Sequence, residues 1–327
     1  MRKITKLPIL ALILLLLTVM MLSLGSTEVS LAALLRGNAD AVVETIFWEI
    51  RLPRVLLAII VGAGVSVAGA AIQGLFRNPL ADPALIGVSS GAALFAAGFM
   101  VLNLDTSALG LLGVSGSAFI GGLLTSWLVL EIGQRSGTIS SMLLAGIALN
   151  AIAIAGVGLF SYLSSDLELR SVTFWALGSF NGADWPSVVI ALIIPVAIVF
   201  LARESRNLNA ITLGDKDAFY LGIDVTRLRQ RIIVLTAIIV GVGVALTGIV
   251  AFVGLVVPHL IRLTSSSNHA VVIPGSAILG AILVLIADGV GRTIISPAEL
   301  PIGILTALLG GPFFIYLIIH QKGKLGI

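Results

Sequence analysis

The stretch VLLAIIVGAGVSVAGAAIQGL, residues 55–75, decides the fold of this chain. It carries no charged side chain, and a helix needs about 20 mostly apolar residues to cross a bilayer. Part of it, VGAGVSVAG at 61–69, is matched by VGVGVALTG at 240–248, with five of nine residues identical. Repeats of this kind are typical of transporters when they run in opposite directions. The alternative is chance similarity between helices rich in Gly and Val.

The whole chain shares this apolar character. Its 327 residues are 58% hydrophobic and only 11% charged, with a mean hydropathy of +1.15, whereas soluble domains carry about 25% charged residues. A soluble chain of this composition could not cover its surface with polar groups, but lipid tails solvate apolar faces. We therefore predict an all-α membrane protein that forms a single transmembrane domain over residues 1–327.

Ten apolar segments are long enough to serve as transmembrane helices. The seventh and eighth form a nearly continuous run, which we divide at Thr247 and Gly248. The first follows a basic start, as in a signal peptide, but its length favours an uncleaved helix. The two repeat copies begin five spans apart, so they should run in opposite directions. The segments are 7–24, 55–75, 85–102, 109–130, 140–163, 187–202, 232–246, 248–263, 271–288 and 301–320.

The basic residues predict the orientation of these spans. Ten spans place both termini on one side of the membrane. If that side is the cytoplasm, 14 basic residues fall inside and five outside, the five being Arg36, Arg51, Arg54, Arg170 and Arg292. The positive-inside rule therefore places both termini in the cytoplasm. The same asymmetry accounts for the net charge of +3, so we predict no nucleic-acid partner.

The predicted spans contain little that could perform chemistry. Their cores carry no Lys, Arg, Asp or Glu, and Asp288 and Glu299 lie near the outer mouth beside Arg292, with which they can pair. An ion-coupled transporter would need a carboxylate or His relay at mid-membrane, and an intramembrane enzyme would need a cluster of polar side chains. The absence of cysteine excludes thiolate metal sites, and no phosphate-binding loop is present. We predict no catalytic residue, cofactor or metal site.

An inner segment at 203–231 is the first candidate for a partner site. Its central stretch LGDKDAFYLG, residues 213–222, predicts a short helix. Asp215 can cap the start of this helix, and Gly222 can end it in a left-handed turn. Ala218, Phe219 and Leu221 would then offer an apolar surface to a groove on another protein. The alternative is a solvated connector.

The outer mouth is the second candidate. Arg51 and Arg54 precede the second span and Arg292 follows the ninth. Arginine forms bidentate pairs with carboxylates, so these three could hold acidic residues of a partner or substrate. An interface anchor or an internal ion pair would explain them equally well. The outer loop at 164–186 contains TFWALGSFNGADW, whose aromatic residues suit the membrane interface.

Five stretches of this sequence resemble the FecCD family, the iron-chelate and cobalamin permeases of bacterial ABC importers. The resemblance covers nearly the whole chain in order, with one departure at Ala251, where glycine is expected. The stretches are RLPRVLLAIIVGAGVSVAGAAIQGLFRNPLADPALIGVSSGA at 51–92, LLAGIAL at 143–149, LGDKDAFYLGID at 213–224, AFVGLVVPHLIRL at 251–263 and AELPIGILTALLGGPFF at 298–314.

The resemblance implies an architecture and a set of partners. It implies a type II ABC importer permease in the bacterial inner membrane, with ten helices, that pairs with a second copy of itself around a central path. Two ATPase subunits would bind inside and a substrate-binding protein would dock outside. Arg51, Arg54 and Arg292 align with arginines that meet glutamates of the binding protein. The residues that align with the coupling helices are Leu213, Gly214, Asp215, Ala218, Phe219, Leu221 and Gly222.

The implied mechanism is alternating access, with ATP hydrolysis on a separate subunit. Thr138, Ser140 and Ser141, at the inner start of the fifth span, are candidates for an inner gate, and equally for a helix cap. An ion-coupled secondary transporter is the competing class, and an intramembrane enzyme is the third.

The sequence informs the substrate only weakly. The stretches FRNPLADPALIGVSSGAAL and TFWALGSFNGADW look most like haem-importing members of the family. Ferric siderophore is the close alternative and cobalamin the third. His259, His269 and His320 are interpreted as structural or solvated residues, because axial ligation inside a transport path would slow release.

Overall fold

The computed structural model describes residues 6–25, 33–34, 36–102, 110–136, 138–295 and 298–320, and every regular element within them is helical. Residue 109 and the chain ends at 1–5 and 321–327, on which some sequence predictions depend, lie outside these ranges. The helices are α1 Lys6–Ser23, α3 Ala41–Thr45, η1 Ile46–Arg51, α4 Leu52–Leu75, η2 Pro83–Ile86, α5 Val88–Val101, α6 Gly110–Ser136, α7 Ile139–Leu163, α8 Asp166–Leu177, α9 Trp185–Ala191, α10 Ile193–Arg203, α11 Ser205–Ile211, α12 Asp215–Tyr220, α13 Val225–Thr247, α14 Val253–Thr264, α15 His269–Thr293 and α16 Ile302–His320.

The predicted spans are present, with several different boundaries. Seven helical segments are long and apolar enough to cross a membrane, and three shorter apolar helices, at Val88–Val101, Val253–Thr264 and Ile302–Tyr316, occupy the remaining predicted spans. The second span is longer than predicted, because α3, η1 and α4 form one continuous segment, Ala41–Leu75. The predicted span at 187–202 is divided into α9 and α10 at Leu192.

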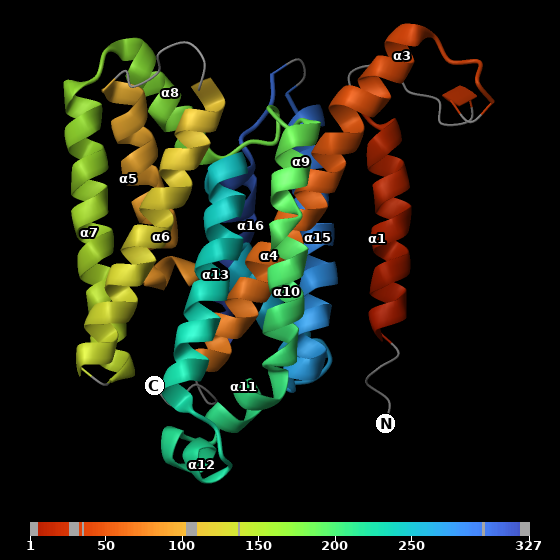
Figure 1. Ribbon diagram of the computed structural model, residues 1–327. Helices are drawn as coiled ribbons and strands as arrows, with labels where there is room; N and C mark the ends of the chain where they lie inside the picture. The colour runs from red at the N-terminus through yellow and green to blue at the C-terminus, as the bar shows by residue number, and fades with distance from the viewer. Residues whose placement is uncertain are drawn as a thin grey trace.

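The two repeat copies lie on neighbouring central helices that run in opposite directions (Figure 1). Copy 61–69 lies within α4, and copy 240–248 ends α13. Their matched valines, Val61 with Val240 and Val65 with Val244, line the same small cavity. The copies differ at their last glycine. Gly69 continues α4, whereas Gly248 has a φ of 70° and ends α13 at the predicted turn.

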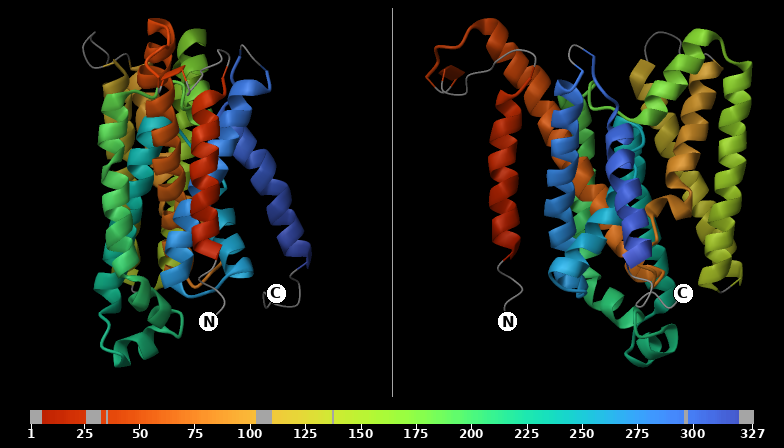
Figure 2. Two further views of the ribbon diagram at one scale, coloured as in Figure 1. Left: turned by 90° about the vertical axis from the view of Figure 1, so that its right-hand side faces the viewer. Right: turned by 180° about the vertical axis from the view of Figure 1, so that it is seen from behind.

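Helix α4 forms the centre of the bundle because its small residues allow close approach. It packs against α13, α14 and α15. A Cβ atom at Gly69 would lie 1.8 Å from the carbonyl oxygen of Gly254, and one at Gly62 would lie 2.6 Å from that of Gly280. Small residues at such crossings are the usual way for membrane helices to associate, since lipid supplies no hydrophobic force between them. By contrast, α1 and α7 lie on opposite flanks with few of their side chains buried (Figure 2).

The segments 203–231 and 164–186 contain more helix than the sequence predicted. The inner segment holds α11, α12 and the first two turns of α13, which begins at Val225. The outer segment holds α8, which starts with a capping box formed by Ser165 and Glu168. Helix α1 begins and α16 ends at the same end of the bundle as α12, and α8 lies at the opposite end (Figures 1 and 2). We call these the inner and outer ends, following the orientation predicted by the basic residues.

Candidate functional site

Helix α12 projects from the inner end of the bundle (Figure 1). Its N-cap is Gly214, which has a φ of 132° and offers no side chain, so the predicted cap at Asp215 is wrong. Asp215 is instead the first helical residue. The predicted left-handed turn at Gly222 is confirmed, with a φ of 83°. Its amide donates to the carbonyl of Phe219 at 2.9 Å.

Asp215 ties α12 to the two central helices. One carboxylate oxygen accepts from Arg229 Nη2 at 2.5 Å, and the other lies 3.5 Å from Arg77 Nη2. Arg229 belongs to the early turns of α13, and Arg77 stands two residues beyond the end of α4. The carboxylate therefore joins α12 to the two helices that carry the repeat. Neither arginine has a role that could be assigned from the sequence.

The outward face of α12 is aromatic. The side chains of Phe219 and Tyr220 are 70% and 83% exposed, and Leu213 and Leu221 are also exposed. Ala218 is fully buried, so its predicted place on the contact surface is wrong. Its amide donates to the carbonyl of Gly214 at 3.0 Å. Tyr220, which the sequence analysis omitted, takes its place.

A groove of about 430 Å³ runs beside this face, between α12 and the start of α13. The groove combines exposed aromatic edges with charges of both signs. This is the composition expected of a docking surface, where aromatic residues supply contact area and charges set the register. Its lining residues are Asp215, Lys216, Phe219, Tyr220, Val225, Thr226 and Arg229.

At the outer end, charged residues form a buried cluster. Arg54 donates from Nη2 to Asp288 at 2.8 Å, and from Nη1 and Nη2 to the two oxygens of Glu299 at 3.0 and 2.9 Å. Arg292 Nε lies 3.2 Å from the second oxygen of Asp288. The predicted pairing of Arg292 with Asp288 is confirmed, whereas Glu299 is paired with Arg54. One carboxylate, Asp288, thus serves two buried arginines.

Arg51 holds the end of the first helix. Its Nη1 donates to the carbonyls of Leu22 and Ser23 at 3.2 and 2.7 Å, so it satisfies the last turn of α1. Arg51 and Arg54 are only 4% and 7% exposed. All three predicted docking arginines therefore already have partners inside the chain. The internal ion pair, one of the alternatives from the sequence, is realised by Arg54 and Arg292, and the docking role stays a prediction.

Thr138 caps α7. Its Oγ1 accepts from the amide of Ser141 at 3.1 Å and lies 2.6 Å from the Ser141 hydroxyl. The structure thus confirms the helix cap that the sequence offered as one alternative for these residues. Ser140 is exposed in the first turn. The gate role of the three residues stays a prediction.

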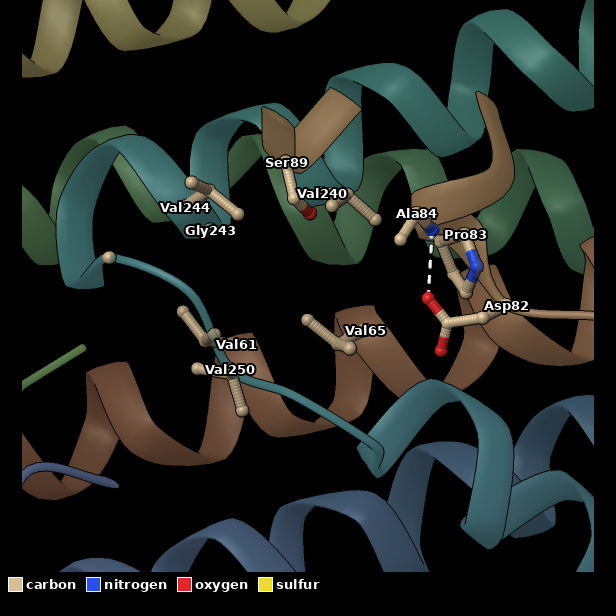
Figure 3. Close-up of a pocket in the computed structure, with 11 residues that line it drawn as sticks. Val61, Val65, Asp82, Pro83, Ala84, Ser89, Val240, Gly243, Val244 and Val250 are labelled. Carbon is tan, nitrogen blue, oxygen red and sulfur yellow. Dashed lines mark hydrogen bonds between the residues drawn. The ribbon is translucent and has the colours of Figure 1, made fainter. Parts of the chain in front are cut away.

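Asp82 was not singled out from the sequence. It lies in the interior because the chain between α4 and α5 enters the bundle. Its Oδ1 accepts from the amide of Ala84 at 2.8 Å and caps η2. The rest of the carboxylate faces a cavity of about 20 Å³ that Ser89 and the matched valines also line (Figure 3). That volume is about enough for one water. The signal was the pair Asp82 and Pro83, an N-cap followed by proline at a helix start.

A second buried polar group stabilises the inner end. Arg262 donates to Gln73 Oε1, and Gln73 donates to the carbonyl of Leu255 at 3.1 Å. His269 is buried, with Nδ1 2.8 Å from Asn209 Oδ1, as expected of a structural histidine. Within the residues that the structure describes, no three His, Asp or Glu side chains gather into a possible metal site.

Three comparisons with known proteins agree with this architecture. The FecCD transport family matches residues 12–320. The hemin transport system permease protein HmuU of Yersinia pestis is 43% identical over 304 residues, covering 92% of this chain and 91% of the relative. The vitamin B12 import system permease protein BtuC of Salmonella typhimurium is 40% identical over 282 residues, with 85% of each covered.

A solved structure described as an inward-facing conformation of a metal-chelate type ABC transporter superposes with a TM-score of 0.88. It is 33% identical to this chain and covers 97% of this chain and 99% of its own.

Proposed function

This chain belongs to the FecCD transport family, and from that premise we propose that it imports haem. It is the transmembrane permease subunit of an ABC importer, so the ATPase is a separate subunit. The observation that carries the choice of haem is the similarity to HmuU, at 43% identity over 92% of the chain. Cobalamin and other metal chelates are the second candidates, because BtuC is 40% identical.

The proposed mechanism starts at α12. An ATPase that holds Phe219 and Tyr220 moves α12 when it closes around ATP. Asp215 passes that movement to α13 through Arg229, at 2.5 Å, and to the end of α4 through Arg77, at 3.5 Å. Because α4 and α13 run in opposite directions at the centre of the bundle (Figure 1), a push at their inner ends rocks one against the other. Such rocking of inverted repeats opens a path alternately to each side.

The proposed assembly is two copies of this chain, two ATPase subunits and one substrate-binding protein. The exposed apolar side chains of α7, such as Leu144, Ile147 and Ile154, support a lateral contact with a second copy or with lipid. Its location is the bacterial inner membrane, with both termini in the cytoplasm. Tyr220→Cys tests this orientation, because the natural chain contains no other cysteine. We expect an impermeant maleimide to label it in inverted vesicles that lack the ATPase and not in intact cells.

Docking of the binding protein is proposed at the outer cluster. Glu299, whose side chain is 32% exposed, is the accessible partner of Arg54. An acidic residue of the binding protein can compete with Glu299 for this arginine, while Asp288 holds its other side. Docking would then exchange one carboxylate for another and leave no arginine unpaired. Charge reversal at Arg54 should weaken docking at low salt, and unchanged affinity would remove this role.

The substrate is tested with the complete importer in liposomes. We expect haem on its binding protein to stimulate ATP hydrolysis more than a ferric siderophore or cobalamin does. Stimulation by cobalamin or a siderophore alone would replace haem as the substrate and leave the permease assignment intact. Hydrolysis that responds to none of the three would contradict the proposed coupling.

A further inference from the structure

A groove on the side of the bundle, separate from α12, lies between the end of α10 and the start of α13. These helices pack side by side, and α11 and α12 continue beyond their inner ends (Figure 1). The groove has a volume of about 450 Å³, within the range of ligand pockets. It is lined by Phe200, Arg203, Glu204, Gln230, Arg231, Val234 and Leu235.

Of the two arginines that line the groove, one is available to bind a ligand. Glu204 accepts from Arg231 Nη1 at 3.2 Å with one oxygen and from Asn207 Nδ2 at 2.6 Å with the other. Arg203 instead lies over the ring of Phe200, 5.3 Å from its centre. Among the described residues no carboxylate forms a salt bridge with Arg203. Two arginines against one glutamate give the groove a net charge of +1.

The surroundings of the groove are apolar and face outward. An exposed stripe of Val189, Ile193, Val196 and Phe200 recurs every three to four residues along α9 and α10, so it occupies one side of the helix. Val234 on α13 adds to it near the inner end. This membrane span ends at Arg203, which puts its guanidinium at the depth of lipid headgroups.

From this arrangement we propose that the groove binds an anionic phospholipid. The phosphodiester contacts Arg203, with Arg231 beside it, and an acyl chain lies along Phe200 and the α10 stripe. Guanidinium groups bind phosphate oxygens with charge-assisted hydrogen bonds, and basic pockets between membrane helices bind anionic headgroups. A zwitterionic lipid fits less well, because its positive group would face the arginines. The site does not depend on the transported substrate.

Lipid binding to the purified chain tests this proposal. The probes are dihexanoyl phosphatidylglycerol, dihexanoyl phosphatidylcholine and glycerol phosphate, and the readout is the dissociation constant of each. Removing one arginine near a headgroup costs about 1 kcal/mol, or about fivefold in affinity. We therefore expect Arg203→Gln to bind phosphatidylglycerol about fivefold more weakly and to lose less affinity for phosphatidylcholine, whose net charge is zero. Its unfolding temperature without lipid should equal that of the wild type, because Arg203 is exposed.

Arg170→Gln is the matched control. Arg170 also lies over a phenylalanine, Phe174, at 5.4 Å, but at the outer end on α8. It should bind phosphatidylglycerol like the wild type. Equal affinity of Arg203→Gln and wild type, or an equal loss in Arg170→Gln, would overturn the site. Binding of phosphatidylcholine or free glycerol phosphate as tight as that of phosphatidylglycerol would overturn the assignment to an anionic lipid.

Discussion

The two ends of the bundle use charge in opposite ways. At the outer end, Arg54 and Arg292 are buried against Asp288, and Arg51 is buried against the end of α1. At the inner end, Asp215 anchors α12 and leaves the aromatic face of Phe219 and Tyr220 in the open. Because the outer end already pairs its own charges, a partner that docks there must displace one of these carboxylates. An end that exposes aromatic side chains offers contact area that a partner can bury.

The largest effect is expected from Asp288→Ala. This change removes the carboxylate that Arg54 and Arg292 share and leaves both arginines buried. Breaking a buried ion pair costs about 3–5 kcal/mol. The unfolding free energy in detergent micelles should fall by that amount. Glu299→Gln is the control, because the 32% exposed side chain of Glu299 takes part in a weaker, partly solvated pair. Equal losses in both variants would contradict the buried character of the outer cluster.

A smaller loss of stability is expected from Asp215→Asn. The Asp215 side chain is partly exposed, so its ion pairs with Arg229 and Arg77 contribute about 1 kcal/mol or less to folding. The main effect should be on the coupling of ATP hydrolysis to transport, because α12 loses its ionic link to α4 and α13. The ratio of substrate imported to ATP hydrolysed should fall.

Asp217→Asn provides the comparison for Asp215→Asn. It removes the same charge from the same helix, but no salt bridge of Asp217 is seen among the described residues. If both variants lower the ratio of substrate imported to ATP hydrolysed equally, the charge of α12 matters and its ionic link to the central helices does not.

The smallest change in folding is expected from Phe219→Ala. Its side chain is 70% exposed, so the unfolding free energy should stay within about 0.5 kcal/mol of wild type. Affinity for the ATPase should fall by about 2 kcal/mol, or about 30-fold, as for an aromatic anchor. Phe174→Ala, an exposed phenylalanine of α8 at the outer end, should leave that affinity unchanged. Unchanged affinity in Phe219→Ala would remove α12 as the docking site.

The architecture was predictable because it depends on composition. Apolar length located the spans, and the turn at Thr247 and Gly248 was visible because glycine tolerates the φ of 70° that ends α13. The division of the seventh and eighth spans therefore held. The early start of α13 at Val225 was not visible, because its first turns carry three arginines that read as part of a loop.

The sites were less predictable because burial depends on tertiary packing. From their spacing in the sequence, Arg54 and Arg292 could serve either docking or internal pairing. The close packing of α4 against α15 brings both arginines within 2.8–3.2 Å of the Asp288 carboxylate, so internal pairs form. Ala218 was assigned to the contact surface because its direction depends on how α12 lies against the bundle. Asp82 was missed because a polar stretch between two spans was assumed to lie outside the membrane.

Uptake by reconstituted liposomes tests most directly whether the driving force enters at α12. The chain is reconstituted with its binding protein, once without the ATPase under an imposed ion gradient and once with the ATPase and ATP. The account predicts that haem accumulates against its gradient only in the second case, and that Phe219→Ala abolishes most of this uptake. Accumulation by the chain without the ATPase would contradict it.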